Sequence, residues 1–253
     1  MEAAGPFDII GDVHGCYDEL ALLLEALGYR MDRPGFCASP PPGRRAVFLG
    51  DLCDRGPKNA QSLLLAMNMA DSGAALCVVG NHDDKLLRNL RGGKVRHAPE
   101  PEDTARCVRA RGAAFARRVA AFIEGLPSHC VFDGGGLVIA HAGLKEEFHG
   151  RYCPQERHFC LYGDTTGERD EYGFPVRRPW MDDYRGGALV VYGHTPLSEV
   201  MEVNNTICID TGCVFGGALT ALRYPERELV SIPAARTYFA PVLPLAPGHA
   251  ASC

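Results

Sequence analysis

The chain has 253 residues, of which 46% are hydrophobic, so it can bury one large core in one or two domains. A net charge of −5 and an isoelectric point near 6.0 exclude a global basic field that would attract nucleic acid. No apolar run approaches the roughly 18 residues of a membrane helix, and the N-terminus lacks the pattern of a secretory signal. We therefore expect a cytoplasmic protein, and eleven cysteines without a C-x-x-C pair suit that reducing compartment.

Short Val- and Ile-rich runs that end in Gly or a charged residue recur along the chain, and they predict strands. They lie at Phe7–Ile10, Ala46–Leu49, Ala75–Val79, Leu137–Ala140, Ala188–Tyr192, Thr206–Ile209, 219–224 and 228–233. Helical periodicity covers residues 17–29, 59–73, 82–90 and 106–126. The β-α-β-α-β order of the first half predicts parallel strands, whereas Asp133 and the three glycines after it predict a turn between antiparallel strands. The expected fold class is α/β, with a mixed, helix-flanked sheet or two packed sheets.

Residues 1–235 are predicted to form one domain. Within it, residues 144–187 have little periodicity, which predicts an irregular, insert-like segment near the functional site. Residues 236–253 are rich in Pro and Ala, which predicts a flexible tail. The stretch from Lys85 to Arg118 carries ten Lys and Arg against three acids. Such a run is more often a solvated helical face than a phosphate-binding patch, so it supports an anionic substrate only weakly.

Oxygen and imidazole donors follow five of the predicted strands, at the end where each strand stops. A single polar residue in this position is most often a loop or capping group, but five strand ends of the same chemical kind indicate a site. Ligands of open α/β sheets gather at the carboxyl ends of strands because the loops there converge. The candidate donors are Asp12, His14, Asp51, Asn81, His141 and His194.

These donors suit two metal ions. Two divalent ions about 3.5–4 Å apart need a shared carboxylate, and Asp51 is the expected bridge. Asp12 and His14, two residues apart, can reach one ion, while Asn81, His141 and His194 complete the shell of the other. Mixed carboxylate, imidazole and amide ligands favour transition ions over Mg²⁺ or Ca²⁺. We expect Mn²⁺, with Fe, Zn, Ni or Co as alternatives.

The chemistry expected of such a centre is hydrolysis at phosphorus. Water between two cations loses a proton near neutral pH, and both ions withdraw charge from phosphoryl oxygens. Arg55 can clamp phosphate with its planar fork. His82 is the candidate general acid for the leaving oxygen, with Asp54 holding its tautomer. The alternative for Asp54 and Arg55 is a local ion pair at a turn.

The motifs "GDVHG", "GDLCDRGP", "GNHD", "HAG" and "GHT", in this order, resemble those of the phosphoprotein-phosphatase family of calcineurin-like metallophosphoesterases. The resemblance spans roughly residues 7–233. It implies an α/β/β/α sandwich of two mixed sheets with a dinuclear centre. It also implies the metal ligands named above, a His82–Asp54 acid pair and a phosphate-binding Arg55.

Further segments indicate which members of this family the chain resembles. "GNHD" with "IDTGCVFGGALTALRY" is similar to symmetrical bis(5′-nucleosyl)-tetraphosphatases, which implies hydrolysis of diadenosine tetraphosphate to ADP. The segment "LYGDTTGERDEYGFPVRRPW" is also similar to the phosphatase module of bacterial polynucleotide kinase-phosphatases. The family implies a second phosphate-binding arginine, Arg177 or Arg178, and a supporting role behind the ligands for Asp210.

Three other functions stay open at this point. One is a phosphoprotein Ser/Thr phosphatase, and the second is an RNA-end 3′-phosphatase or 2′,3′-cyclic phosphodiesterase, for which RNA ends are the partner. The third is an inactive module that senses nucleotides. We expect a nucleotide or phosphate-ester substrate, no membrane and no obligate protein partner.

Overall fold

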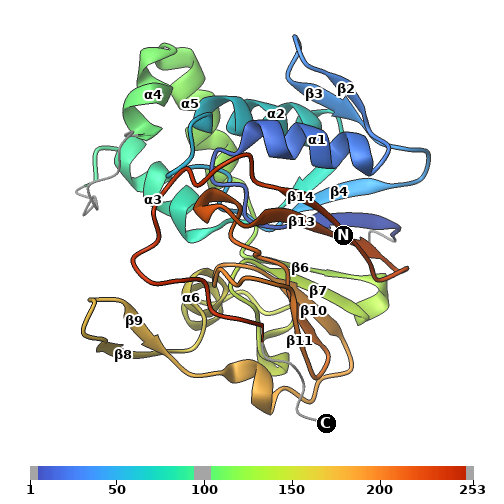
Figure 1. The fold of residues 1–253 in the computed structure, drawn as a ribbon, viewed down its shortest axis with the longest axis vertical. Coiled ribbons are helices and arrows are strands. Elements are labelled where there is room, and N and C mark those ends of the chain that lie inside the picture. The colour runs from blue at the N-terminus through green and yellow to red at the C-terminus, as the bar shows by residue number, and fades with distance from the viewer. Residues whose placement is uncertain (1–4, 94–103, 249–253) are drawn as a thin grey trace.

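Two five-stranded sheets form the centre of the protein, whose computed structural model describes residues 5–93 and 104–248 (Figure 1). The first sheet has the order β14-β13-β1-β4-β5 and the second β11-β12-β10-β7-β6. The strands of the first are β1 (Phe7–Ile10), β4 (Arg45–Phe48), β5 (Ala75–Cys77), β13 (Ala218–Tyr224) and β14 (Glu228–Pro233). Those of the second are β6 (His129–Phe132), β7 (Leu137–Ala140), β10 (Leu189–Tyr192), β11 (Met201–Val203) and β12 (Thr206–Cys208).

Both sheets are mixed, as expected. Strands β1, β4 and β5 are parallel, and so are β7, β10 and β12. The predicted turn at Asp133 joins β6 and β7, which are antiparallel. The carboxyl ends of the parallel strands in both sheets therefore deliver their loops to one shared edge.

Helices cover the outer face of the first sheet, and α6 packs beside the second (Figure 1). The helices are α1 (Tyr17–Ala26), α2 (Asn59–Asp71), α3 (Asn81–Leu90), α4 (Thr104–Ala110), α5 (Ala113–Glu124) and α6 (Pro154–Tyr162). Successive side chains of a strand face opposite sides of the sheet, so the strands contribute to two parts of the core. Ile10 faces the helices, whereas Ile9 faces the other sheet together with Val47 and Ile139. The α/β/β/α sandwich is confirmed. No helix within the described residues is long and apolar enough to cross a membrane.

The differences from the predicted elements have local causes. The predicted helix over 106–126 is two helices, because Gly112 adopts a left-handed φ of 101° between α4 and α5. The hairpin of β2 (Arg30–Asp32) and β3 (Cys37–Ser39) was not predicted, because its three-residue strands are too short to show a period.

Residues 144–187 are more regular than their sequence indicates. They contain α6, a hairpin of β8 (Thr165–Arg169) and β9 (Pro175–Arg177), and 3₁₀ turns at Glu146–Phe148 and Trp180–Asp183. The C-terminal residues 236–248 contain no helix or strand, yet the backbone N–H groups of Tyr238 and Phe239 donate to the carbonyl of Val214 at 3.0 Å. The domain boundaries stay a prediction.

A buried carboxylate attaches α6 to the second sheet. Glu156 is 1% exposed, and its Oε1 accepts hydrogen bonds from Ser128 Oγ at 2.5 Å, His129 Nδ1 at 2.8 Å and Cys160 Sγ at 3.2 Å. Its Oε2 accepts from the backbone N–H of Cys153, which caps the helix. One side chain therefore satisfies four donors: Ser128 just before β6, His129 in β6, Cys153 just before α6 and Cys160 in α6.

We expect Glu156→Ala to lower the free energy of unfolding by about 3 kcal/mol, because several buried donors lose their acceptor. Urea unfolding at a fixed metal concentration measures the change. Gln155→Ala, at an exposed position of the same helix, is the control and should change stability by less than about 0.5 kcal/mol. Equal stability of the two variants would contradict this account of α6.

Candidate metal centre

All six predicted metal donors lie together at the shared edge of the two sheets. Each lies shortly after the carboxyl end of a parallel strand of one sheet or the other. The loop after β1 carries Asp12 and His14, and the loop after β4 carries Asp51. The start of α3, after β5, carries Asn81, and the loops after β7 and β10 carry His141 and His194. The first sheet thus supplies four donors and the second supplies two.

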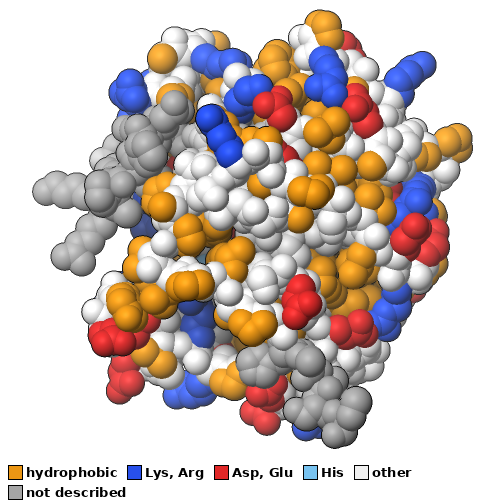
Figure 2. Space-filling view, in the orientation of Figure 1, with side chains coloured by type: hydrophobic (Ala, Val, Ile, Leu, Met, Phe, Trp, Pro, Cys, Tyr) orange, Lys and Arg blue, Asp and Glu red, His pale blue; other side chains and the backbone are white. Residues whose placement is uncertain are grey.

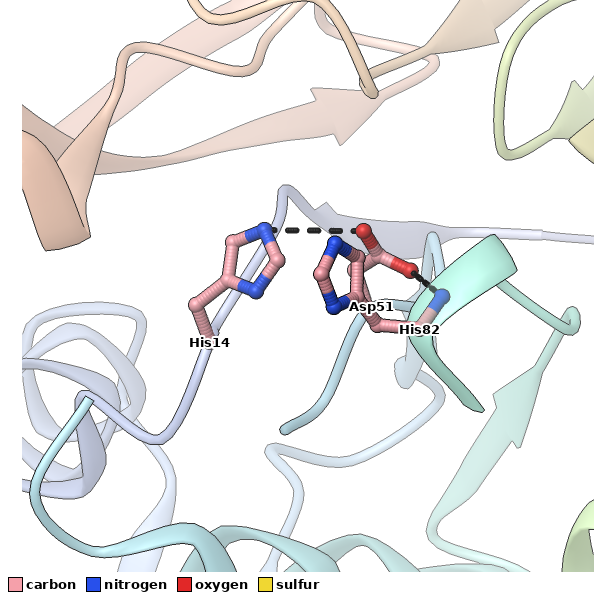
Figure 3. Close-up of side chains that lie close together, drawn as sticks. All are labelled: His14, Asp51 and His82. Atoms are coloured by element: carbon pink, nitrogen blue, oxygen red, sulfur yellow. Dashed lines mark hydrogen bonds and ion pairs between the residues drawn. The ribbon is translucent and has the colours of Figure 1, made fainter. Parts of the chain in front are cut away.

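Asp51 lies at the middle of the group. Its Oδ2 is 3.5 Å from His14 Nε2 and 3.5 Å from His141 Nε2, so it faces both halves of the site. Its Oδ1 accepts a 2.9 Å hydrogen bond from the backbone N–H of His82 (Figure 3). The orientation of this carboxylate is therefore set by the first turn of α3.

The second half of the site is a close triangle of donors. His141 Nε2 lies 3.0 Å from His194 Nδ1, and Asn81 Oδ1 lies 2.9 Å from each of these nitrogens. Asp51, His141 and His194 each place a ligand atom within 4.8 Å of the others. These distances are short enough for one ion to contact all of the donors.

Backbone carbonyls set the tautomers of two histidines. His14 Nδ1 donates to the carbonyl of Cys53 at 2.9 Å, and His141 Nδ1 donates to that of Leu49 at 3.1 Å. A carbonyl only accepts, so each Nδ1 holds a hydrogen and each Nε2 turns a lone pair into the site. Burial lowers the pKa of His14 to about 3 and also lowers that of His141, so both rings are neutral at pH 7.

This set of donors fits divalent metal ions. Two carboxylates, an amide oxygen and imidazole nitrogens turn acceptor atoms toward one another in a buried space, and Asp12 Oδ1 has no hydrogen-bond partner. Burial, together with Asp210 and Asp51, raises the pKa of Asp12 well above its ordinary value. Bound cations would remove both the repulsion and the unpaired acceptor.

Two motif glycines allow the backbone to approach the carboxylates. A Cβ at Gly80 would lie 2.2 Å from Asp51 Oδ1, and a Cβ at Gly193 would lie 2.1 Å from Asp12 Oδ1. Both contacts are far inside van der Waals separation. Any side chain at either position would therefore displace one of the two candidate ligand carboxylates.

His82 and Asp54 form the predicted pair. His82 Nδ1 donates to Asp54 Oδ2 at 2.7 Å, which leaves Nε2 free of that bond and close to His14 and Asp51. Thr104 Oγ1, at the start of α4, donates to Asp54 Oδ1 at 2.5 Å. Burial alone would raise the pKa of Asp54, but the hydrogen bonds from His82 and Thr104 lower it. Thr104 was not predicted, because no spacing links it to the motif that carries Asp54.

Arg55 points into the same site. Its Nη1 lies 3.0 Å from His14 Nε2, and its guanidinium lies 5.3 Å from the ring centroid of Phe215 and 6.0 Å from that of Phe239. These cation–π contacts orient the arginine beside the donors. Phe239 belongs to the predicted tail, so its contribution could not be inferred from a Pro- and Ala-rich sequence.

The two other candidate arginines differ in position. Arg177 Nη2 lies 2.8 Å from His194 Nε2, whereas Arg178 pairs with Asp164 and its side chain is 63% exposed. The structure thus brings only Arg177 to the donors. Asp210 lies behind them: its Oδ1 accepts from Gly212 N at 3.1 Å, and burial raises its pKa to about 7.

Comparison with known proteins agrees with this geometry. Residues 5–198 match the family model of the calcineurin-like phosphoesterases. The chain is 45% identical over 238 residues to the "bis(5′-nucleosyl)-tetraphosphatase PrpE [asymmetrical]" of Anoxybacillus flavithermus, covering 92% of this chain and 96% of the relative. It is 42% identical over 236 residues to the protein of the same name from Bacillus subtilis, again covering 92% and 96%.

The names of these relatives specify asymmetrical enzymes, and in this they differ from the symmetrical activity that the motifs predict. The physical reason is that the shared motifs carry the candidate metal donors and the candidate phosphate-binding Arg55. The position of the cut depends instead on where the nucleosides bind, and no motif encodes that.

Solved structures show the same fold at low identity. A "putative diadenosine tetraphosphatase" superposes with a TM-score of 0.65 at 23% identity, covering 92% of this chain and 95% of that one. A cold-active protein-tyrosine phosphatase of a Shewanella species superposes with a TM-score of 0.59 at 19% identity, covering 90% and 78%. The chain therefore belongs to the calcineurin-like phosphoesterases and is a metal-dependent hydrolase of phosphate esters or anhydrides.

Proposed function

We propose that the chain hydrolyses bis(5′-nucleosyl) tetraphosphates asymmetrically, into a nucleoside triphosphate and a nucleoside monophosphate. The observation that carries this proposal is the 45% identity over nearly the full length of both chains to a relative with that name. The complete set of six donors supports it, because an inactive nucleotide sensor would not need all of them.

The side chains suggest how the metals would be held. Asp12 and His14 would bind one ion, Asn81, His141 and His194 the other, and Asp51 both. Bound there, two divalent ions supply the activation of the attacking water and withdraw charge from the phosphoryl oxygens. We propose Mn²⁺, because imidazole, carboxylate and amide ligands together favour a transition ion, with Fe, Zn, Ni or Co as alternatives.

The chain's own groups would bind and protonate the substrate. Arg55 and Arg177 reach the donors from opposite halves of the site, so their guanidinium groups can hold the oxygens of one phosphate between them. His82, with Nδ1–H held by Asp54, can donate the proton on its other nitrogen to the leaving oxygen. Thr104 keeps the Asp54 carboxylate turned toward that ring.

The open alternatives have less support. An RNA-end phosphatase needs a basic path to the metals, and the stretch from Lys85 to Arg118 is the candidate. Within its described part, Arg88 pairs with Asp84, Arg91 with Glu124 and Arg118 with Asp71, as on an ordinary solvated helical face. Lys94 and Arg96 lie outside the described residues. The cytoplasmic location stays a prediction, based on the cysteine content.

Product analysis tests the function. With Mn²⁺ and diadenosine tetraphosphate, we expect ATP and AMP in equal initial amounts by chromatography, because the cut divides four phosphates into three and one. Two ADP per substrate would instead show symmetrical cleavage. Faster turnover of a phosphopeptide or a 2′,3′-cyclic nucleotide than of diadenosine tetraphosphate would overturn the proposed substrate.

We expect Asp51→Asn to lose at least one of two bound metal equivalents, together with nearly all activity, because a neutral amide cannot hold two cations with one oxygen. Elemental analysis of the purified protein measures the metal. Asp18→Asn, in an exposed ion pair with Lys58, is the matched control and should keep both equivalents. Full metal content in Asp51→Asn would remove this residue from the shared position.

We expect His82→Ala to reduce kcat by about 10²–10⁴-fold for an alkyl phosphate, whose leaving oxygen needs a proton. The loss for 4-nitrophenyl phosphate should be much smaller, because nitrophenolate leaves without one. Steady-state rates on the two esters, at matched metal content, give the comparison. Equal losses on both would mean that His82 is not the acid.

A further inference from the structure

The β8–β9 hairpin projects from the body of the protein beside α6 (Figure 1). Arg177, the last residue of β9, donates from Nε to the carbonyl of Tyr162 at 2.9 Å and places Nη2 2.8 Å from His194 Nε2. Asp164, just before β8, accepts from both Lys145 and Arg178. The base of the hairpin is thus tied to the body and carries positive charge next to the donors.

The tip of the hairpin is held rigidly by its own hydrogen bonds. Asp170 Oδ1 accepts from the backbone N–H groups of Tyr172 at 3.0 Å and Phe174 at 2.8 Å. The backbone of Asp170 also donates to Phe174 O at 2.9 Å and accepts from Gly173 N at 3.0 Å. The turn therefore has a defined shape without support from the rest of the protein.

This rigid tip exposes two aromatic rings. Tyr172 is 53% exposed and Phe174 is 43% exposed, and apolar side chains appear on this part of the surface (Figure 2). The structure keeps both rings in water although an ordinary hairpin turn would be polar. Because the backbone around them is already ordered, a flat ligand could stack on them at little further entropic cost.

Charge changes sign along the hairpin. Arg177 and Arg178 lie at the base, whereas the tip with the aromatic rings has three acids, Glu168, Asp170 and Glu171, against one arginine, Arg169, which donates to the carbonyl of Gly173. A nucleotide has the complementary order: anionic phosphates at one end, and at the other a flat base with ribose hydroxyls and amino groups that donate hydrogen bonds. Arg177 comes three residues after Phe174, with Pro175 and Val176 between them, and three steps along an extended strand span about 10 Å, a distance that several linked phosphates are needed to cover.

We infer that the tip of the β8–β9 hairpin binds a nucleoside of the substrate, with its base on Tyr172 and Phe174, while the reacting phosphate lies near Arg177 at the base. The inference rests on the proposed function and extends it. Holding one nucleoside several phosphates away from the metals places the reacting bond near the other nucleoside, and this divides four phosphates unequally.

The test is the KM of a variant that carries both Tyr172→Ala and Phe174→Ala. Because base–aromatic stacking contributes about 1–3 kcal/mol, we expect KM for diadenosine tetraphosphate to rise about 5- to 150-fold, with kcat changed less than about twofold. KM for 4-nitrophenyl phosphate should not change, because this ester is too short to reach the tip. A variant with Tyr172→Phe and Phe174→Tyr keeps both rings and should keep the wild-type KM.

Leu229→Ala, at an exposed apolar position of β14, is the control and should leave both substrates unaffected. An unchanged KM for diadenosine tetraphosphate in the double alanine variant, while the wild-type protein makes ATP and AMP, would overturn the inference and leave the proposed function standing. Equal increases in KM for both substrates would overturn it as well. A wild-type protein that does not cleave diadenosine tetraphosphate would overturn the proposed function, and the inference with it.

Discussion

The structure depends on one constraint, which is that buried acceptor atoms from two sheets converge on a common space. Asp12, Asp51, Asn81 and the inward nitrogens of His14 and His141 repel one another unless positive charge lies between them. Burial increases the repulsion because water cannot screen it. Cations at this edge would replace the repulsion between these acceptors with attraction to a shared positive charge. Metal binding and the packing of the two sheets would therefore stabilise each other.

The loops that carry the site contain strained backbone conformations with positive φ. Nine non-glycine residues with positive φ occur in the described part of the chain, and five of them, His14, Asp51, Asp54, Arg55 and His194, belong to the site. Each such conformation costs roughly 1–2 kcal/mol, and the strands before these loops supply the packing that holds it. Ile9 and Val47 are fully buried directly upstream, so the loops cannot relax without disturbing the core between the sheets.

Groups outside the six candidate metal ligands orient the other side chains of the site. Phe215 and Phe239 hold Arg55 in place, Thr104 orients Asp54, and the hairpin brings Arg177 to His194. Thr104 comes from a helix, Arg177 from the β8–β9 hairpin, Phe215 from the 3₁₀ turn between β12 and β13, and Phe239 from the C-terminal residues. Parallel strands thus position the candidate metal donors, while a helix, the hairpin, a 3₁₀ turn and the C-terminal residues position the groups around them.

The sequence alone determined most of the fold and predicted six metal donors that the structure brings to one edge. Short β-branched runs alternating with leucine-rich helices specify parallel strands, and ligands at their carboxyl ends must then meet at one edge, as Asp51 and His141 do. The roles of His82, Asp54 and Arg55 were predicted from the same motifs and stay predictions, although the structure places all three at the donors.

Only the tertiary structure distinguished Arg177 from Arg178. Adjacent residues in an extended segment face opposite sides, and the sequence shows no hydrophobic pattern that identifies the side facing the site. The tertiary structure alone also revealed the order within residues 144–187. The helix there is attached through the buried Glu156, and the hairpin through contacts between residues distant in sequence. Local sequence patterns record periodicity and turns, whereas the shape around the substrate arises from long-range packing that no single segment encodes.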